Sequence, residues 1–478
     1  MFVSLFFPVY LGVISVLFFV LPGKRRPALL LASSYFFCGW LDIRALAVLV
    51  LFSLCTWRAG LVIEGQKKKG NENRSRSCLI LATGLGIGLL GLYKYVPYFS
   101  LRFSLSGELA RGLAEGLVMP VGLSFYLFQA IGYLADIYRG KSPAEKNFLY
   151  IGCCLAFFPK LISGPIERAE EFLPQIKAVK DVRFYDRGRL STAFTYMLWG
   201  YFMKMVVADR LAVTVNQIFD APQVFDSFWL VAGALLYTMQ IYCDFAGYSY
   251  IAVGCAAVFG IKLTQNFRAP YCAVGITDFW RRWHVSLSTW LRDYLYIPLG
   301  GNRKGMTRKC VNTMVVFLVC GMWHGAGVNF IVWGLMHGIY SVAETLGRRM
   351  GVKIRGGRIV TFLAVAFAWI FFRASSFGAA AGYIGRMLTA GLRPGMWRQY
   401  IEQLHLNTVE IVVIVAGILV IWLVDELCSR KKLHLPTMIQ HRQNAARYLV
   451  FYMLIVAIFI FGMYGPGYHA EQFIYMQF

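Results

Sequence analysis

Long runs of apolar residues, separated by short charged loops, dominate this sequence. Most runs approach the roughly 20 residues that an α-helix needs to cross a bilayer. The runs cover about 1–22, 28–41, 45–63, 78–100, 117–135, 149–166, 192–208, 227–262, 310–345, 358–372, 408–428 and 446–465. The pattern predicts an all-α, polytopic transmembrane helical bundle with about ten crossings. Since no long polar linker interrupts it, we expect one membrane domain over 1–478, with N-terminal helices in 1–148, a core in 149–345 and C-terminal helices in 346–478.

Clusters of Lys and Arg predict the orientation, because cytoplasmic loops carry an excess of these residues. The loops at 24–26, 67–76 and 430–447 are basic and are expected to be cytoplasmic. The N-terminus and the tail from Gly465 then lie outside. The first run has its charges behind it, whereas a removable signal peptide has them ahead, so we expect a retained transmembrane helix.

Two runs do not fit a simple crossing, because basic loops lie on both sides of each. Run 149–166 contains two prolines and a lysine, and run 310–345 is too long for one pass and is interrupted at Gly325 and Gly327. Broken backbone at membrane depth is tolerated only where protein buries it or where it lines a cavity. Both runs are therefore predicted to be broken or re-entrant.

Composition supports a membrane protein. Charged residues make up 15% and hydrophobic residues 58%, against about 25% charged in soluble proteins. Lys and Arg total 48 against 24 acidic residues, a net charge of +24. In a membrane chain this charge suits anionic lipid, the expected partner, and no nucleic-acid-binding motif suggests otherwise. The 11 cysteines form no CxxC and the histidines form no HExxH, so no metal site is expected.

His324 is the first candidate for chemistry, because it lies at the interruption of run 310–345. Ionisable residues at membrane depth are costly and usually face a cavity or a partner. The neighbouring glycines allow a substrate or a backbone to approach closely. The alternative is a histidine that packs against a neighbouring helix. His337 would lie on a different face of a continuous helix, and packing is the favoured interpretation for it.

His284 follows a stretch that mixes charged and aromatic residues, Asp278 to Trp283. One interpretation is an amphipathic helix at the membrane interface with an aromatic belt. The other is the wall of a polar pocket, in which Arg281 and Arg282 pair with Asp278, with Asp244 or with an anionic group of a substrate.

Two further features carry polar groups. Asp244 lies inside an apolar run and needs a cation or several donors, so either a structural pair with a buried arginine or a functional role is expected. The turn Gly300 to Gly305 contains Asn302 and Arg303 but lacks the order of a nucleotide P-loop. It is interpreted as an interfacial turn or as a cytoplasmic cradle for phosphates.

Taken together, these stretches resemble the motifs of the membrane-bound O-acyltransferase family, in its bacterial alginate O-acetyltransferase-like branch. The similar stretches follow one another in the same order over almost the whole chain, at 119–126, 158–166, 242–248, 278–303, 323–325 and 473–478. Met476 is a mild departure, because this position is usually aromatic in the family.

The resemblance implies broken helices around a central tunnel, with an acyl donor arriving from the cytoplasm and an acceptor from the opposite side. His324 matches the principal catalytic histidine and His284 the second important polar position. The expected substrate-binding residues are Asp244, Arg281, Arg282, Trp283, Trp323, Asn302 and Arg303. The donor would be acetyl-CoA or another acyl thioester, with no bound cofactor, and an extracytoplasmic SGNH-type acetyltransferase or esterase would be the partner.

The hypothesis is an O-acetyltransferase of the bacterial inner membrane. It moves acetyl from cytosolic acetyl-CoA across the membrane toward an alginate-like polysaccharide or peptidoglycan, with His324 as general base or as acyl acceptor. Two alternatives stay open. One is D-alanyl transfer to teichoic acid from a carrier-protein thioester. The other is a transporter or flippase, for which inverted repeats would be expected.

Overall fold

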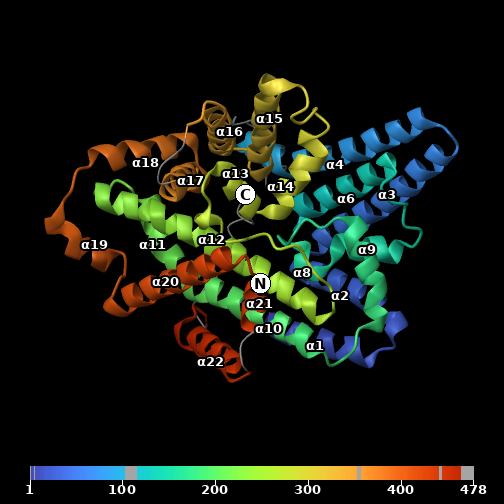
Figure 1. Ribbon diagram of the computed structural model, residues 1–478, viewed down its shortest axis with the longest axis horizontal. Coiled ribbons are helices and arrows are strands. Elements are labelled where there is room, and N and C mark those ends of the chain that lie inside the picture. The colour runs from blue at the N-terminus through green and yellow to red at the C-terminus, as the bar shows by residue number, and fades with distance from the viewer. Residues whose placement is uncertain (1, 5, 103–115, 353–356, 441–443, 465–478) are drawn as a thin grey trace. The chain divides into compact units, whose positions relative to one another are not determined.

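The computed structural model describes residues 2–4, 6–102, 116–352, 357–440 and 444–464. Within these ranges the chain forms helices and connecting loops without a strand, so the all-α class is confirmed (Figure 1). The chain divides into two compact units. Unit 1 comprises 1–7, 194–251 and 265–478, and unit 2 comprises 8–193 and 252–264. The expected single domain with three successive parts stays a prediction.

Unit 2 contains the helices of the first third of the chain, most of which the apolar runs predicted. They are α1 (Phe6–Val20), which begins in unit 1, α2 (Arg26–Leu41), α3 (Ile43–Lys68), α4 (Glu72–Arg102), α6 (Leu123–Arg139), α7 (Phe148–Ala156), α8 (Phe158–Leu161), α9 (Ala169–Ala178) and the start of α10 (Arg187–Tyr201). Helix α3 packs against both α4 and α6. Gly60 permits the second contact, because a Cβ there would lie 3.0 Å from the Tyr133 ring.

The predicted break in run 149–166 is confirmed. Helix α7 ends before Phe157, α8 is a single turn, and residues 151–167 are all buried within unit 2. The buried Lys160 ammonium donates to the Gln129 side-chain carbonyl, and to the Cys154 backbone carbonyl at 2.5 Å. Protein groups thus satisfy this broken backbone and its charge, as a break at membrane depth requires. Its re-entrance into a membrane stays a prediction.

Unit 1 contains the remaining helices. They are the rest of α10 with a π-helical segment (Phe202–Ala208), α11 (Asp209–Asp220), most of α12 (Ser227–Val258), α13 (Ile276–Arg282), α14 (Val285–Leu291), α15 (Gly305–His324), α16 (Val328–Arg349), α17 (Gly357–Arg373), α18 (Phe377–Thr389), α19 (Trp397–Gln403), α20 (Thr408–Lys431), α21 (Leu435–Gln440) and α22 (Asn444–Phe461). One apolar core lies where α11, α12, α17, α18 and α19 meet, around Leu230, Ile370 and Tyr383.

Five of the described helices are long and apolar enough to cross a membrane unaided, namely α3, α4, α12, α20 and α22. Helix α1 is also apolar but has only 15 residues. In α12 the apolar stretch is 89% buried within the protein, whereas in α22 it is 6% buried. Helix α12 is therefore an internal helix, and α22 presents its apolar side chains outward, as a lipid-facing helix does. The multi-pass character agrees with the prediction, and the number of about ten crossings stays a prediction.

The apolar runs did not predict the shorter amphipathic helices α9, α11 and α18. Each buries one face and exposes the other, so its sequence contains no continuous apolar run. The predicted location of the C-terminal tail from Gly465, and its motif at 473–478, lie outside the described residues.

Candidate functional site

The predicted interruption of run 310–345 is confirmed, and it forms a helical hairpin. Helix α15 ends at His324 and α16 begins at Val328. The two helices meet backbone to backbone at Gly321 and Gly334. A Cβ on Gly321 would lie 2.4 Å from the Phe330 carbonyl oxygen, and a Cβ on Gly334 would lie 2.3 Å from the Phe317 carbonyl oxygen. Only glycine permits this approach, which fixes the end of α15 against α16.

His324 is thereby held in a narrow aromatic environment. Its side chain is buried, and its ring meets Trp323, Trp333 and Phe372 edge to face at 4.8, 5.0 and 5.3 Å between centroids. The buried Asn329 amide fixes the facing helix, because it donates to the backbone carbonyls of Phe371 and Ala374 at 3.2 and 2.9 Å. The orientation of the imidazole is therefore determined by packing on α15, α16 and α17.

His284 lies near the same tryptophan. It occupies the sharp junction between α13 and α14, with φ at +42°, and is fully buried. Its ring contacts Phe245 at 4.8 Å and Trp323 at 6.3 Å between centroids. Hydrogen bonds from the N–H groups of Val285 and Ser286 to Asn266 hold this junction in place. The structure thus brings both predicted catalytic histidines into contact with Trp323, from two separate hairpins.

His337 belongs to the packing on the other side of Trp333. The Trp280 indole donates to the His337 Nδ1 at 3.3 Å, and the ring is fully buried among Trp280, Trp333 and Trp369. This agrees with the packing interpretation. Trp283, expected to bind substrate, joins the same aromatic packing through Trp369 at 5.1 Å.

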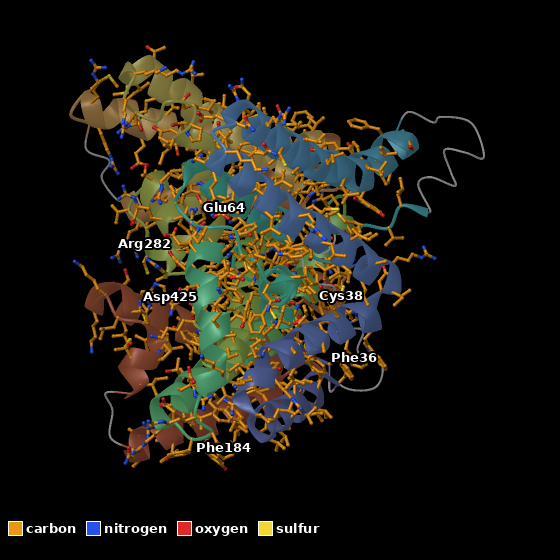
Figure 2. All side chains as sticks on the ribbon, turned by 90° about the vertical axis from the view of Figure 1, so that its right-hand side faces the viewer. Phe36, Cys38, Glu64, Phe184, Arg282 and Asp425 are labelled. Carbon is orange, nitrogen blue, oxygen red and sulfur yellow. The ribbon has the colours of Figure 1, made fainter. Side chains whose placement is uncertain are left out.

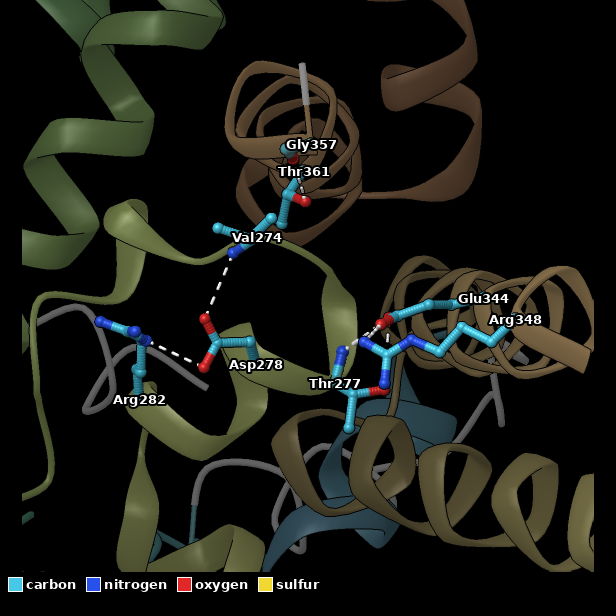
Figure 3. Close-up of polar contacts among 8 residues, drawn as sticks. All are labelled: Val274, Thr277, Asp278, Arg282, Glu344, Arg348, Gly357 and Thr361. Atoms are coloured by element: carbon cyan, nitrogen blue, oxygen red, sulfur yellow. Dashed lines mark hydrogen bonds and ion pairs between the residues drawn. The ribbon is translucent and has the colours of Figure 1, made fainter. Parts of the chain in front are cut away.

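Asp278 and Arg282 of α13 form an ion pair with each other (Figure 3). Asp278 accepts hydrogen bonds from the Arg282 Nε at 3.0 Å and from the Val274 backbone N–H at 3.2 Å. Arg282 also donates to the Ser429 hydroxyl at 3.0 Å, which ties α13 to the end of α20. Arg281 is exposed. Of the two aspartates expected as partners for these arginines, the structure selects Asp278.

A polar cavity of about 370 Å³ opens beside these residues. Its lining includes Arg282 and Asp425, which Figure 2 labels. Further lining groups are basic or aromatic and come from α10, α12, α13, the loop before α13, and the α20–α21 junction, namely Arg268, Arg281, Lys432, His434, Tyr196, Trp199, Tyr250 and Phe267. We call it the basic cavity. Partial burial, together with the nearby Arg268 guanidinium, lowers the pKa of His434, so this imidazole is neutral near pH 7.

The basic cavity has a polar floor and a basic rim. Tyr196 and Tyr250 stack at 5.7 Å in nearly parallel planes, and Asp425 accepts a hydrogen bond from the Tyr242 hydroxyl at 2.8 Å. The lining contains three arginines and a lysine against two aspartates. Such a lining suits an anionic ligand with a flat group, because arginine binds phosphate oxygens and aromatic faces accept a ring.

The prediction that Asp244 pairs with a buried arginine is wrong. Asp244 pairs with Lys204 at 2.5 Å, and Lys204 also contacts Asp209 at 2.7 Å. All three side chains are buried, and Lys204 lies in the π-helical segment after α10. This segment approaches α12 closely, since a Cβ on Gly247 would lie 3.1 Å from the Lys204 backbone nitrogen. The sequence interpretation did not single out Lys204, although it is a charged residue inside an apolar run.

Asn302 and Arg303 are exposed on the turn after the second π-helical segment (Arg292–Tyr296), whereas the histidines are buried. Gly300 and Gly301 have φ angles of +105° and +56°, and the Asn312 amide donates to the Gly301 carbonyl at 2.9 Å. The structure thus shows a turn that a hydrogen bond fixes in place and whose polar side chains are exposed. It does not bury them beside His324.

Metal ligands are also absent from the part of the chain that is described: no three His, Cys, Asp or Glu side chains gather closely enough to hold an ion. The expectation of no metal stays a prediction.

Sequence reasoning missed Asn329, Lys204, Trp333 and His434. For the first two, a polar residue inside an apolar run was an available signal. For the last two, only the fold brings them to the site.

Comparison with known proteins adds an independent finding. Residues 147–376 match the model of the membrane-bound O-acyltransferase family. The "Probable alginate O-acetylase AlgI" of Pseudomonas putida is 36% identical, over 82% of this chain and 79% of the relative. The "Peptidoglycan O-acetyltransferase" of Helicobacter pylori is 34% identical, over 74% of this chain and 71% of the relative. The "Teichoic acid D-alanyltransferase" of Bacillus subtilis is 27% identical, over 54% of this chain and 67% of the relative.

Proposed function

Because this chain belongs to the membrane-bound O-acyltransferase family, in its alginate O-acetyltransferase-like branch, we propose that it transfers acetyl from cytosolic acetyl-CoA across the membrane to a cell-envelope or extracellular polysaccharide. It is a multi-pass membrane acyltransferase, which argues against the alternative of a transporter or flippase. The bacterial inner membrane, and extracytoplasmic N- and C-termini, are part of the proposal. So is a secreted SGNH-type partner that completes the transfer to the polymer.

The observation that carries the proposal is the pair of buried histidines that both contact the Trp323 ring. An acceptor hydroxyl attacks the carbonyl carbon of the acetyl thioester, the C–S bond breaks, and coenzyme A leaves as the thiol. In this scheme His324 takes the hydroxyl proton and returns it to the leaving sulfur, an effect worth about 10²- to 10⁴-fold. Alternatively, His324 forms the acyl intermediate itself.

His284 is proposed to stabilise the oxyanion, together with backbone N–H groups near Gly325. Preorganised donors are effective in a site that excludes water, because they need not reorient as charge develops. The burial of His284 and its bonded junction fit this role. Trp323 is proposed to line the path along which the acetyl group reaches His324.

The basic cavity is proposed to bind the phosphates of the donor. Arg281 and Arg282 were expected to bind substrate, and the lining adds Arg268 and Lys432 from other elements. Asn302 and Arg303 are proposed to attract the donor's phosphates from their exposed turn. For Asp244 and Trp283 the contacts support positioning of the surrounding helices in place of direct contact with substrate.

Acetyl transfer from labelled acetyl-CoA by the purified protein tests the proposal. We expect acetylated acceptor, or acetyl-enzyme when no acceptor is added, and no product from His324→Ala. A matched control is His405→Asn, because His405 is exposed and has a positive φ that asparagine tolerates. Wild-type turnover in a folded His324→Ala protein would refute the role of His324.

The donor and the mechanism have their own assays. Acetyl-CoA and an acetylated carrier protein are compared side by side, and turnover with the carrier alone would favour the D-alanyltransferase type of donor. Acid quenching without acceptor, followed by peptide mass spectrometry, detects acetyl on His324. Its absence during normal turnover favours the general-base mechanism.

A further inference from the structure

A second cavity of unit 1 lies apart from the basic cavity. It encloses about 520 Å³ between α16, α17 and the loop before α13, and shares no lining residue with the basic cavity. Its walls are mostly aliphatic side chains and glycines, including Val274, Gly347, Val360 and Ala364, together with the aromatic ring of Tyr340. We call it the α16–α17 groove. Its volume lies within the range of about 300–1,000 Å³ that small-ligand pockets occupy.

One end of the groove is polar (Figure 3). Glu344 is buried there and accepts hydrogen bonds from the Thr277 backbone N–H at 2.9 Å, from the Thr277 hydroxyl at 3.2 Å, and from Arg348. The Arg348 side chain is nevertheless 63% exposed. Because a guanidinium carries five N–H donors in a fork, Arg348 has donors left for a second anion.

The rim of the groove is apolar and exposed. Large apolar side chains stand outward on both helices around it, including Leu346, Val352, Ile359 and Leu363. In a membrane-spanning protein such a surface contacts lipid chains. Arg348 and Arg349 lie in the last turn of α16. The basic ends of apolar helices lie at the headgroups of the cytoplasmic leaflet, where anionic lipids are found.

We propose that the α16–α17 groove binds one acyl chain of an anionic phospholipid, with the lipid phosphate on the guanidinium of Arg348. The groove supplies the apolar length, the Glu344–Arg348 pair marks its polar end, and the exposed apolar rim opens to the bilayer. The buried carboxylate is already satisfied by Thr277 and Arg348, so it does not repel the phosphate as an isolated charge would. This lipid site does not depend on the proposed acetyl transfer.

Filling the groove tests the site. A Cβ on Gly347 would meet nothing closer than the Val352 Cβ at 3.8 Å, so a larger side chain can enter the groove without a backbone clash. The full-length protein is purified in detergent, delipidated, and offered dioleoylphosphatidylglycerol or dioleoylphosphatidylcholine. Bound lipid is then counted by native mass spectrometry. We expect tighter retention of phosphatidylglycerol, and about tenfold weaker retention by Gly347→Leu.

The matched control is Gly382→Leu, because Gly382 is a helical glycine that also accepts a Cβ without a clash and lies outside the groove. It should retain phosphatidylglycerol as the wild type does. Arg348→Gln should lose the preference over phosphatidylcholine, while Arg349→Gln should keep it. Undiminished binding by Gly347→Leu would overturn the site, and equal binding of the two lipids by the wild type would overturn the role of charge.

A measurement on the wild type covers the case in which Gly347→Leu fails to fold. Phosphatidylglycerol with a photoactivatable group at the end of one chain should crosslink to peptides from 340–352 or 357–364. Crosslinks confined to other helices would contradict the proposal.

Discussion

Alanine at Gly334 should displace His324 without unfolding the protein. A Cβ at this position would lie 2.3 Å from the Phe317 carbonyl oxygen, and 3.1 Å from the Gly321 Cα. Ordinary van der Waals contact begins at 3.4 Å. Because both obstacles are backbone, no side chain can rotate away. The two helices of the hairpin must separate by about 1 Å near the end of α15, where His324 lies.

The expected magnitudes differ for stability and for activity. Overpacking of this kind costs about 1–3 kcal/mol, and removing a glycine from a helix interior returns about 0.5–1 kcal/mol. The free energy of unfolding should therefore fall by only about 1–2 kcal/mol. A catalytic group misplaced by about 1 Å can lose about 10²-fold in rate, so acetyl transfer should fall far more than stability does.

Two other glycines of α16 serve as controls. A Cβ on Gly338 would lie 2.8 Å from the Met314 sulfur, which belongs to a flexible side chain that can move. A Cβ on Gly347 would make only an ordinary van der Waals contact, with the Val352 Cβ at 3.8 Å. The kcat measured with labelled acetyl-CoA should be far lower for Gly334→Ala than for Gly338→Ala, with Gly347→Ala near wild type. Thermal unfolding followed by tryptophan fluorescence should show only a modest loss of stability for Gly334→Ala. Equal kcat for Gly334→Ala and Gly338→Ala would show that the backbone contact does not position His324.

The remaining predictions concern buried polar groups and the basic cavity. Lys204→Met should lower the free energy of unfolding, measured by denaturant titration, by about 3–5 kcal/mol, because it removes the ammonium shared by two buried aspartates. Asp244→Asn should lower the free energy of unfolding less, because Lys204 keeps its contact with Asp209. Asn329→Ala should cost about 1–3 kcal/mol and reduce kcat, because two backbone carbonyls at the end of α17 lose their donor. The KM for acetyl-CoA should fall as the pH drops below the pKa of His434, which burial and the nearby Arg268 lower from its ordinary value of about 6.5, because the imidazole then gains a positive charge beside the proposed phosphates. His434→Gln should abolish this pH dependence.

The sequence predicted those features that depend on local composition. Continuous apolar runs identified most of the long helices, and basic loops on both sides of a run identified the two broken segments. These signals are strong because a bilayer imposes a length on a helix and a charge bias on its loops. Helices such as α11 and α18 left no such signal, because their apolar residues occupy only one face.

Partners in space were harder to predict. Asp244 clearly needed a cation, yet nothing along the chain identified Lys204 on a neighbouring helix as its source. The basic cavity draws Arg268, Arg282 and Lys432 from three separate elements. A residue pattern can therefore show that a buried charge must be compensated, whereas the fold alone decides which residue compensates it.

The packing around His324 explains why a site of this kind can exist among apolar helices. A base that must accept a proton in one direction has to be oriented before its substrate arrives. Here the rings of Trp323, Trp333 and Phe372 fix the imidazole from three sides. Those rings are in turn fixed by the glycine contact of the hairpin and by Asn329. Since this support comes from backbone contacts and a satisfied amide, conservative changes at the support should impair catalysis before they impair folding.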